Sequence, residues 1–210
     1  QSGACLANVA EMTDNQEIIA REGGIRPCIS VMRSRFVEVQ RESGRLLANL
    51  CASKADFCTT GIVEAGGHHL LISFLLSQDT ACQQVGAFGI GNLCTHDQHR
   101  VTLMKAGVLE PLCSLARSED IELEIKRFSI LAIANLASTV KTHIAFIEEE
   151  ILPLLVSLSN STDAEVRQFS AFAIAKIAQN SKTRHIVTQE GGLEPVLYLA
   201  RTDEKEVQRE

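Results

Sequence analysis

Five short apolar segments recur along the chain, each with one polar residue at its centre. These central residues are Asn8, Asn49, Asn92, Asn135 and Lys176. Around them apolar residues return at intervals of three and four, which predicts a long amphipathic helix at each segment and no strand. The steps between central residues are 41, 43, 43 and 41, so the chain is predicted to consist of repeats of about 42 residues.

The prolines share this period. All four lie on one register, at Pro27, Pro111, Pro153 and Pro195, and Leu70 stands where a fifth is expected. Proline has no amide hydrogen and a fixed φ, so it suits the first turn of a helix and disrupts a helix interior. We therefore predict that a second helix begins at the same phase of every repeat.

Glycines precede the proline register by a few residues. Glycine permits a positive φ and a close approach of two backbones, so these sites predict a sharp turn between a short first helix and the second helix. In one repeat Glu148–Glu150 replaces the glycines, which we interpret as a solvated acidic turn, with a partner site as the alternative. The aligned positions are Gly23, Gly66, Gly107, Glu149 and Gly191.

Each repeat is thus predicted to contain a short helix 1, a helix 2 and a long helix 3. In the best-defined repeat these are expected over 97–105, 109–117 and 123–138. Polar turns before helix 3 provide N-cap candidates, among them Asp79, Asp120 and Asp163. At the C terminus, Val207–Glu210 aligns with the start of another helix 3.

The pattern E-x-G-G-[IL]-x-P, at Glu22–Pro27 and Glu190–Pro195, and the pattern [LI]-A-N-L, at Leu47–Leu50, resemble the armadillo repeat family. The resemblance covers the whole chain. It implies an all-α fold, a right-handed α-solenoid (superhelix) of three-helix armadillo repeats like those of β-catenin and importin-α. We expect a single array from a longer protein, with a partial repeat 1–12, repeats at about 13–54, 55–96, 97–139 and 140–181, and a partial repeat 182–210.

The resemblance also implies where a ligand binds. In such solenoids helix 3 of every repeat lines a concave groove, and a recurrent Asn hydrogen-bonds the backbone of an extended peptide, since its amide both donates and accepts. The matching residues are Asn8, Asn49, Asn92 and Asn135, whereas Lys176 departs from the pattern. The alternative is that these amides bond to carbonyl groups between repeats.

Two further columns share this helix face, four and eight residues before the Asn column. They carry several arginines and few acids, and the chain has no Trp, which importin-α-like grooves use together with acidic residues to hold Lys-rich signals. We expect a neutral or acidic extended segment in the groove; alternatively, the arginines only make this face soluble. The predicted partner-binding residues are Asn49, Asn92, Asn135, Lys176, Arg41, Arg45, Gln84, Phe88, Arg127 and Gln168, with Arg209 aligned at the C terminus.

Composition narrows the possible functions. The net charge is −6 and no basic run occurs, which argues against binding to nucleic acid. No apolar stretch approaches about 18 residues, and no signal peptide is evident, so no transmembrane segment is expected. Seven cysteines without a C-x-x-C pair predict reduced thiols and a cytoplasmic location, while sequence outside the fragment leaves a nuclear or membrane-peripheral location open.

No cluster of residues predicts catalysis, a metal or a cofactor. The pairs His96/His99 and His68/His69 have no Cys or acidic partner at zinc-like spacing, so we interpret them as loop or helix-start residues. The glycines within Gly86–Gly91 lie inside a helix 3 with no preceding strand. They therefore favour close helix packing, or a locally soft helix, over phosphate binding.

The leading hypothesis is a non-enzymatic protein–protein interaction scaffold or adaptor that binds an extended partner segment in the helix-3 groove. An alternative is a regulatory armadillo domain that controls an attached or bound catalytic domain. A nuclear transport adaptor is less favoured because the chain has no Trp. End-to-end self-association is a further expectation, since the ends of such an array expose surface that another repeat would cover.

Overall fold

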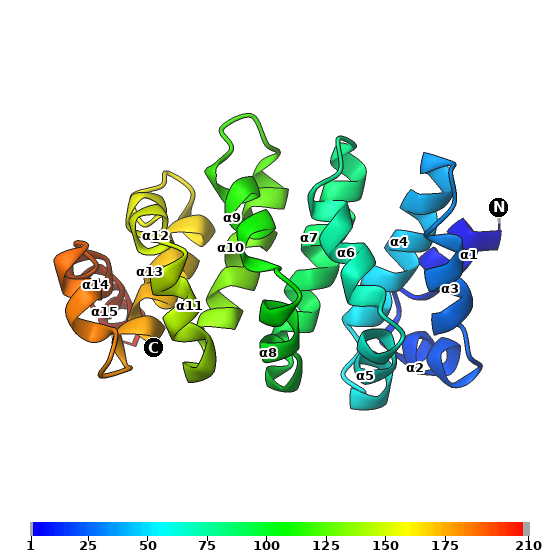
Figure 1. Cartoon of the computed structure of the whole chain (residues 1–210), viewed down its shortest axis with the longest axis horizontal. Coiled ribbons are helices and arrows are strands. Elements are labelled where there is room, and N and C mark those ends of the chain that lie inside the picture. The colour runs from blue at the N-terminus through cyan, green and yellow to red at the C-terminus, as the bar shows by residue number, and fades with distance from the viewer. Residues whose placement is uncertain (1, 208–210) are drawn as a thin grey trace. The chain divides into compact units, whose positions relative to one another are not determined.

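The computed structural model describes residues 2–207, with side chains for 4–198, 200 and 201. Every regular element in this part of the chain is a helix (Figure 1). The elements are α1 (Ser2–Val9), α2 (Thr13–Arg21), α3 (Ile25–Val31), α4 (Val37–Cys51), α5 (Asp56–Glu64), α6 (Gly67–Leu75), α7 (Thr80–Thr95), α8 (Asp97–Lys105), α9 (Leu109–Arg117), α10 (Leu123–Ala137), η1 (Val140–Thr142), α11 (His143–Glu148), α12 (Leu152–Leu158), α13 (Ala164–Ala178), α14 (Arg184–Gln189) and α15 (Leu193–Val207).

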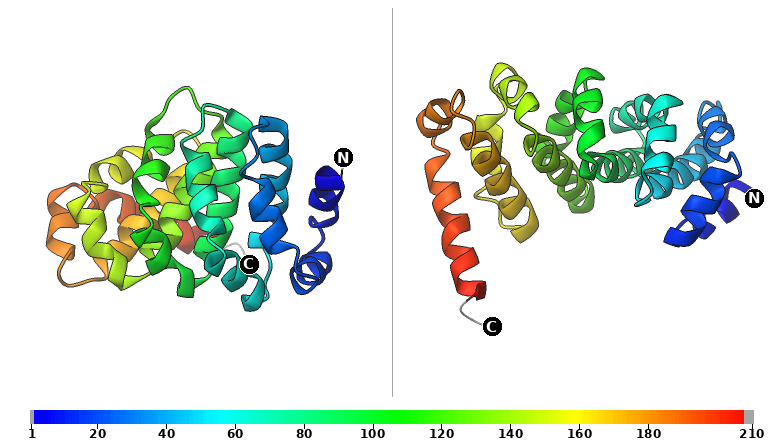
Figure 2. Two further views of the ribbon diagram at one scale, coloured as in Figure 1. Left: turned by 45° about the vertical axis from the view of Figure 1, so that its right-hand side comes forward. Right: turned by 90° about the horizontal axis from the view of Figure 1, so that it is seen from below.

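The chain forms two compact units, Gln1–Pro111 and Leu112–Glu210. In the first unit the long helices α1, α4 and α7 pack side by side, α3 packs on α4, and α6 packs on α7 (Figure 2). In the second unit α10, α12, α14 and α15 all pack against α13. Each unit is therefore a stack in which one helix 3 contacts the next, as in a solenoid. The repeat boundaries expected from the sequence remain a prediction.

The helices of the best-defined repeat agree closely with their predicted bounds. Helices α8 and α9 have the predicted ends, and α10 ends one residue early, at Ala137. Of the predicted N-caps, Asp79 accepts from the backbone N of Cys82 at 2.9 Å, and Asp163 accepts from the backbone N of Val166 at 3.0 Å. Asp120 was the wrong candidate, because the residue before α10 is Glu122, whose side chain makes no capping bond.

Proline and glycine define the turn between helix 1 and helix 2. Every proline lies in the first turn of its helix, at the second or third residue of α3, α9, α12 or α15, as predicted. Gly23, Gly66, Gly107 and Gly191 have φ between 77° and 83°, a left-handed conformation without steric cost for glycine. The glycine after Gly23 instead allows close approach, since a Cβ at Gly24 would lie 2.7 Å from Cγ2 of Ile19.

One turn keeps the left-handed conformation without a glycine. Glu150 has a φ of 53°. The sequence alignment on Glu149 is therefore wrong by one residue, because Glu150 occupies the position of the left-handed glycines. This conformation costs a non-glycine residue about 1–2 kcal/mol, so the turn between α11 and α12 is strained.

The C-terminal helix differs from the prediction. Helix α15 runs without a break from Leu193 to Val207, the residue at which the sequence predicted the start of another helix 3. Residues 202–206 contain neither Gly nor Pro, and most are good helix formers, so nothing in them stops the helix. The predicted continuation at Gln208–Glu210, with Arg209, lies outside the described residues.

Small residues allow helix 3 to pack closely on helix 2. A Cβ at Gly86 of α7 would lie 2.8 Å from the backbone O of Leu71 and 3.0 Å from the backbone N of Leu75. The corresponding residues of other repeats are Ser43, Ser129 and Ser170, whose hydroxyls donate to the carbonyl four residues earlier and so remain satisfied when buried. Helix α7 is continuous, so its glycines serve close packing.

Candidate functional site

The Asn column lies on successive long helices. Asn8 lies on α1, Asn49 on α4, Asn92 on α7, Asn135 on α10 and Lys176 on α13. Asn8 is exposed, whereas the other four are partly buried. Because α1, α4 and α7 pack side by side in the first unit, and α10 packs on α13 in the second, the column forms a short ladder in each unit.

Asn49 makes a hydrogen bond to the neighbouring long helix. Its Nδ2 donates to the backbone O of Ala7 on the preceding long helix, at 2.9 Å. A hydrogen bond to a carbonyl between repeats was the alternative role considered for this column. At Asn49 one N–H of the side-chain amide therefore connects α4 to α1.

Asn92 and Asn135 also point Nδ2 inward, but there it makes no hydrogen bond. Their Nδ2 atoms are buried and have no hydrogen-bond partner within the described residues. Both residues are partly exposed, yet their amide nitrogens are not. Across the described part of the chain, no hydrogen bond reaches Oδ1 of Asn49, Asn92 or Asn135. The group that these residues leave for a ligand is therefore the carbonyl oxygen, a hydrogen-bond acceptor.

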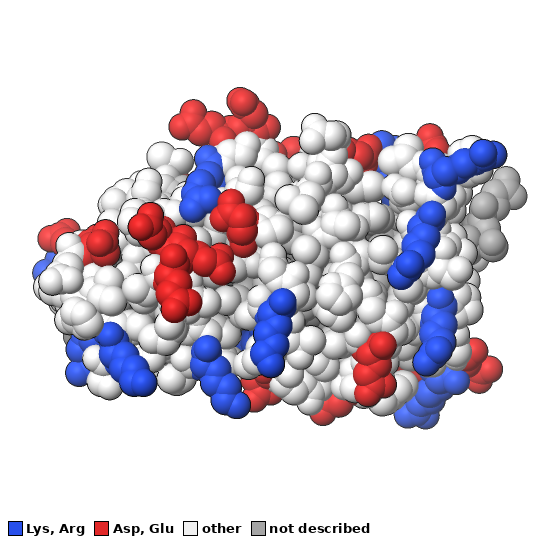
Figure 3. All heavy atoms as spheres, in the orientation of Figure 1, with Lys and Arg blue, Asp and Glu red and all other residues white. Residues whose placement is uncertain are grey.

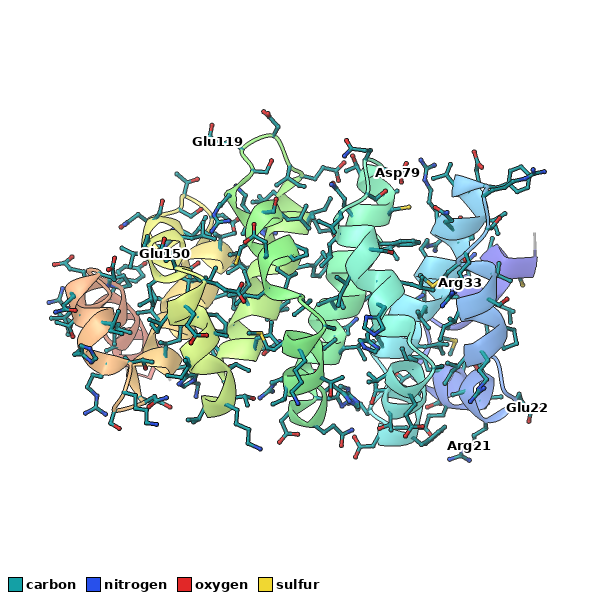
Figure 4. The ribbon with its side chains drawn as sticks, in the orientation of Figure 1. Arg21, Glu22, Arg33, Asp79, Glu119 and Glu150 are labelled. Carbon is teal, nitrogen blue, oxygen red and sulfur yellow. The ribbon has the colours of Figure 1, made fainter. Side chains whose placement is uncertain are left out.

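Arg41 is bound within the chain. Its Nε donates to Oδ1 of Asp79 at 2.9 Å and its Nη2 donates to Oδ2 of the same carboxylate. Asp79, labelled in Figure 4, is the N-cap of α7. The guanidinium, helped by the backbone bond from Cys82, holds the pKa of Asp79 well below its usual range. Arg41 thus joins one long helix to the capped start of the next.

The second unit repeats this arrangement. Nη2 of Arg127 on α10 donates to Oδ2 of Asp163 at 2.5 Å, and its Nε lies 3.2 Å from both carboxylate oxygens. Glu165 is a second acidic neighbour, 3.6 Å from Nε. The ion pair lowers the pKa of Asp163, which caps α13. Both arginines of this column therefore have a structural partner that the sequence analysis did not foresee.

Arg45 is surrounded by acceptors. Its Nη1 donates to Glu42 at 3.2 Å, and its Nη2 donates to Asn8 at 3.1 Å and to Glu11 at 3.3 Å. The last two bonds connect α4 to α1 and the residues that follow it. Consequently the positive charge expected at this end of the groove is neutralised by carboxylates of the same chain.

Lys176 is the exception among the described cations of the helix-3 columns. Its Nζ lies 4.9 Å from the ring centroid of Phe172, a cation–π contact, and no acidic partner lies near it within the described residues. Gln168 is exposed on the same helix, while Gln84 and Phe88 on α7 are partly buried and make other contacts. Lys176 therefore contributes a positive charge on the long-helix face of the second unit.

The sequence analysis missed a recurrent cap at the end of helix 3. A helix leaves its last carbonyl groups without intrahelical partners. In four repeats a side chain of the next helix 1 lies within hydrogen-bond distance of such a carbonyl, between 2.7 and 3.1 Å away. The residue that carries the side chain is six positions after the residue that carries the carbonyl. The pairs are Gln16 with Ala10, Arg100 with Cys94, His143 with Ala137, and Arg184 with Ala178.

The remaining polar candidates are structural. Burial lowers the pKa of His68 and of His99, and Nε2 of His99 lies 3.1 Å from Oγ1 of Thr59. All seven cysteines are free thiols, six of them buried, and burial raises the pKa of Cys28 and of Cys94 to about 12. Among residues 2–207 no three His, Cys, Asp or Glu side chains form a group suited to a metal ion.

No single helix of the described chain is long and apolar enough to cross a membrane. One bent pair, Leu123–Ala137 with Val140–Glu148, meets the criteria of length and composition, with an angle of 102° between its parts.

Taken together, the helix order, the left-handed turns and the ladder of long helices define an all-α solenoid protein built from three-helix repeats. The chain is similar to the armadillo repeat family over part of its length. The model "Armadillo/beta-catenin-like repeat" matches residues 12–52, and the model "HEAT repeat" matches residues 151–181.

Known proteins agree with this assignment. Vacuolar protein 8 of Schizosaccharomyces pombe is 26% identical over 148 residues, which are 70% of this chain. The match covers 26% of that relative, so this chain spans about a quarter of its length. An engineered protein of known structure is 31% identical, with a TM-score of 0.87 over 97% of this chain and 50% of its own.

Designed armadillo repeat proteins have the same fold. A crystal structure of computationally designed armadillo repeat proteins for modular peptide recognition matches 99% of this chain and 87% of its own, with 24% identity and a TM-score of 0.88. A designed armadillo repeat protein in complex with the peptide (KR)4 matches 97% of this chain and 86% of its own, with 24% identity and a TM-score of 0.85.

Proposed function

We propose that this chain is a non-enzymatic scaffold that binds an extended segment of a partner protein along the helix-3 face of its units. One observation carries the proposal: Asn49, Asn92 and Asn135 turn their amide nitrogens inward and leave Oδ1 without a partner. Such acceptors on the long helices of each unit suit the backbone N–H groups of an extended segment, each of which needs an acceptor when it is buried.

The designed armadillo proteins support a peptide ligand, because the printed descriptions of two of them concern peptide recognition and a bound peptide. The charges of this chain favour a different peptide from (KR)4. Arg41, Arg45 and Arg127 already have acidic partners, so most of the face favours neutral side chains. Near Lys176 an acidic side chain is favoured, and a basic segment meets repulsion.

We further propose that the protein acts by binding alone, in the cytoplasm. The buried thiols with raised pKa values are poor nucleophiles, because the thiolate is the reactive form. Reduced, unpaired cysteines fit a reducing compartment.

The test begins with peptides selected against the wild-type chain from a random display library, followed by measurement of Kd by fluorescence anisotropy. Replacing Asn92→Ala together with Asn135→Ala is expected to weaken binding of the selected peptides about 30-fold, since each change removes an acceptor worth roughly 1 kcal/mol. The fold should survive, because neither Nδ2 has a partner to lose.

The matched control is Gln78→Ala together with Gln189→Ala, two exposed amides outside the ladder. It should leave Kd unchanged, and circular dichroism should show the same helix content in both double variants. An Asn variant that binds the peptides as tightly as wild type overturns the proposed use of this face.

A further inference from the structure

A second surface of the first unit lies away from the Asn ladder. A pocket of about 370 Å³ opens between helix 2, α3, and the end of the next helix 1, α5. Arg26, Ile29, Ser30 and Arg33 line it from α3 and the turn that follows, and Glu64 and Ala65 line it from the other side. None of these residues belongs to a helix 3, so the pocket is separate from the proposed peptide-binding face.

The two arginines of this pocket have no ion-pair partner among the described residues. Arg26 and Arg33 are exposed, and neither forms an ion pair or hydrogen bond with the described residues. The arginines on neighbouring helices differ, since Arg21 is paired with Glu17, and Arg41 and Arg45 are also paired. Figure 3 shows Lys and Arg side chains gathered over the α2–α3 side of this face. Although the net charge of the chain is −6, these two arginines favour the binding of an anion at this pocket.

The spacing of the donors suits an elongated ligand. Arg26 lies in the first turn of α3 and Arg33 lies in the turn that follows the helix, and both side chains line the pocket. Ser30, exposed between the two arginines, adds a hydroxyl donor. In an extended peptide, residues three apart are about 10 Å apart, at roughly 3.3 Å per residue. Two carboxylates with this spacing could each meet one guanidinium.

We propose that this pocket binds an acidic segment of a partner protein, with carboxylates three residues apart on Arg26 and Arg33. Guanidinium groups bind carboxylates through two parallel hydrogen bonds, which gives both affinity and orientation. Ile29, nearly buried at 6% exposure, supplies an apolar wall for the stems of the acidic side chains. Glu64 lines the same pocket and repels an acidic ligand, so it limits the affinity.

The experiment measures anisotropy of a labelled (Glu-Gly-Gly)3-Glu peptide on the whole chain at low and at moderate salt. Arg26→Glu with Arg33→Glu should weaken binding about 10-fold or more, since both attractive charges become repulsive. Glu64→Gln should strengthen binding about 3-fold, because it removes the one carboxylate of the pocket. Asn92→Ala with Asn135→Ala should have no effect, so that this proposal and the proposed function fail separately.

The charge-matched control is Lys54→Glu with Lys105→Glu, two exposed lysines of the same unit outside the pocket. It should change Kd by less than about 2-fold. Equal weakening by the control and the arginine variant would show general electrostatic attraction and overturn the proposal. Arginine-dependent binding of a phosphoserine peptide without binding of the Glu peptide would also overturn it. Circular dichroism confirms that each variant is folded.

Discussion

The two units use the same niche, between helix 2 and the next helix 1, with opposite charges. In the first unit the niche between α3 and α5 carries Arg26 and Arg33. In the second unit a pocket of about 250 Å³ between α11, α12 and α14 carries Glu150 and Glu190 over an apolar floor that includes Phe146. Figure 3 shows Asp and Glu side chains gathered over α12. The residues that line these two pockets therefore give them different charges.

The turns beside these two pockets have the same left-handed backbone conformation but different residues. Gly66 has a φ of 78° in the first unit, and Glu150 has a φ of 53° in the second. A left-handed glutamate is strained, so its conformation must be imposed by the helices that flank it and not by its own preference. The packing of the repeat thus determines the left-handed backbone conformation of the turn, and glycine at this position removes the strain energy.

The largest expected effect comes from placing alanine in both turns. At Gly66 a Cβ would meet nothing within 4 Å, so Gly66→Ala costs only the left-handed backbone strain, about 1–2 kcal/mol of unfolding free energy. Glu150→Ala should cost close to nothing, because the wild-type residue already bears that strain. Urea unfolding followed by circular dichroism measures the difference.

Glu150→Gly is the reciprocal change and should stabilise the chain by up to about 1 kcal/mol, reduced by the entropy of glycine in the unfolded state. Hydrogen exchange localises each effect, in α5 and α6 for Gly66→Ala and in α11 and α12 for Glu150→Gly. Equal destabilisation by the two alanines would show that the turns do not differ in strain.

Periodicity predicted the frame because it depends on local chemistry. Proline at the first turn, glycine at a positive φ and apolar residues at helical spacing each act within a few residues, so α8 and α9 have the predicted ends. The position of Glu150 could not be read in this way, since no residue type marks a left-handed glutamate. Helix α15 continues to Val207, where the alignment predicted the start of another helix 3, because residues 202–206 contain no helix-breaking residue.

The site was less predictable because it depends on contacts between repeats. Arg41 and Asp79 are 38 residues apart, and Arg127 and Asp163 are 36 apart. Each residue was noticed alone, the arginines as groove residues and the acids as caps, yet only the folded stack brings them together. The direction of the Asn92 amide is likewise set by packing, and the sequence carries no signal for it.

The next largest effect tests whether the Arg–Asp pair acts alike in both units. Asp79→Ala and Asp163→Ala each remove an N-cap and the ion pair, and each should cost about 1 kcal/mol. Replacement by Asn keeps a capping acceptor and removes the charge, so it should cost less. A much larger loss in one unit, measured by urea unfolding, would show that the two pairs are not equivalent.

These pairs also predict a dependence on acid. The folded-state pKa of both carboxyls lies below the ordinary value of 3.8, so the stabilisation is fully present above pH 3.8 and is lost as the pH falls through the lowered pKa. The Asn variants should lose less stability than wild type on acidification below that value. An unchanged acid profile in both Asn variants would contradict the role of the ion pairs.

The smallest effect distinguishes the units at a milder pH. Burial lowers the pKa of His68 and His99 in the first unit below 6.5, with further lowering by His69 and His96 and partial opposition by Asp56 and Asp97. The unfolded chain therefore binds more protons below pH 6.5, and stability falls as the pH drops from 6.5 towards the lower folded pKa. Tm measured between pH 7.5 and 5 should decline.

His68→Gln with His99→Gln should flatten that decline, whereas replacement of His185, an exposed histidine of the second unit, by Gln should not. Hydrogen exchange at pH 5.5 should loosen α6 and α8 before α12 and α13, and the reverse order would place the acid-sensitive region in the other unit.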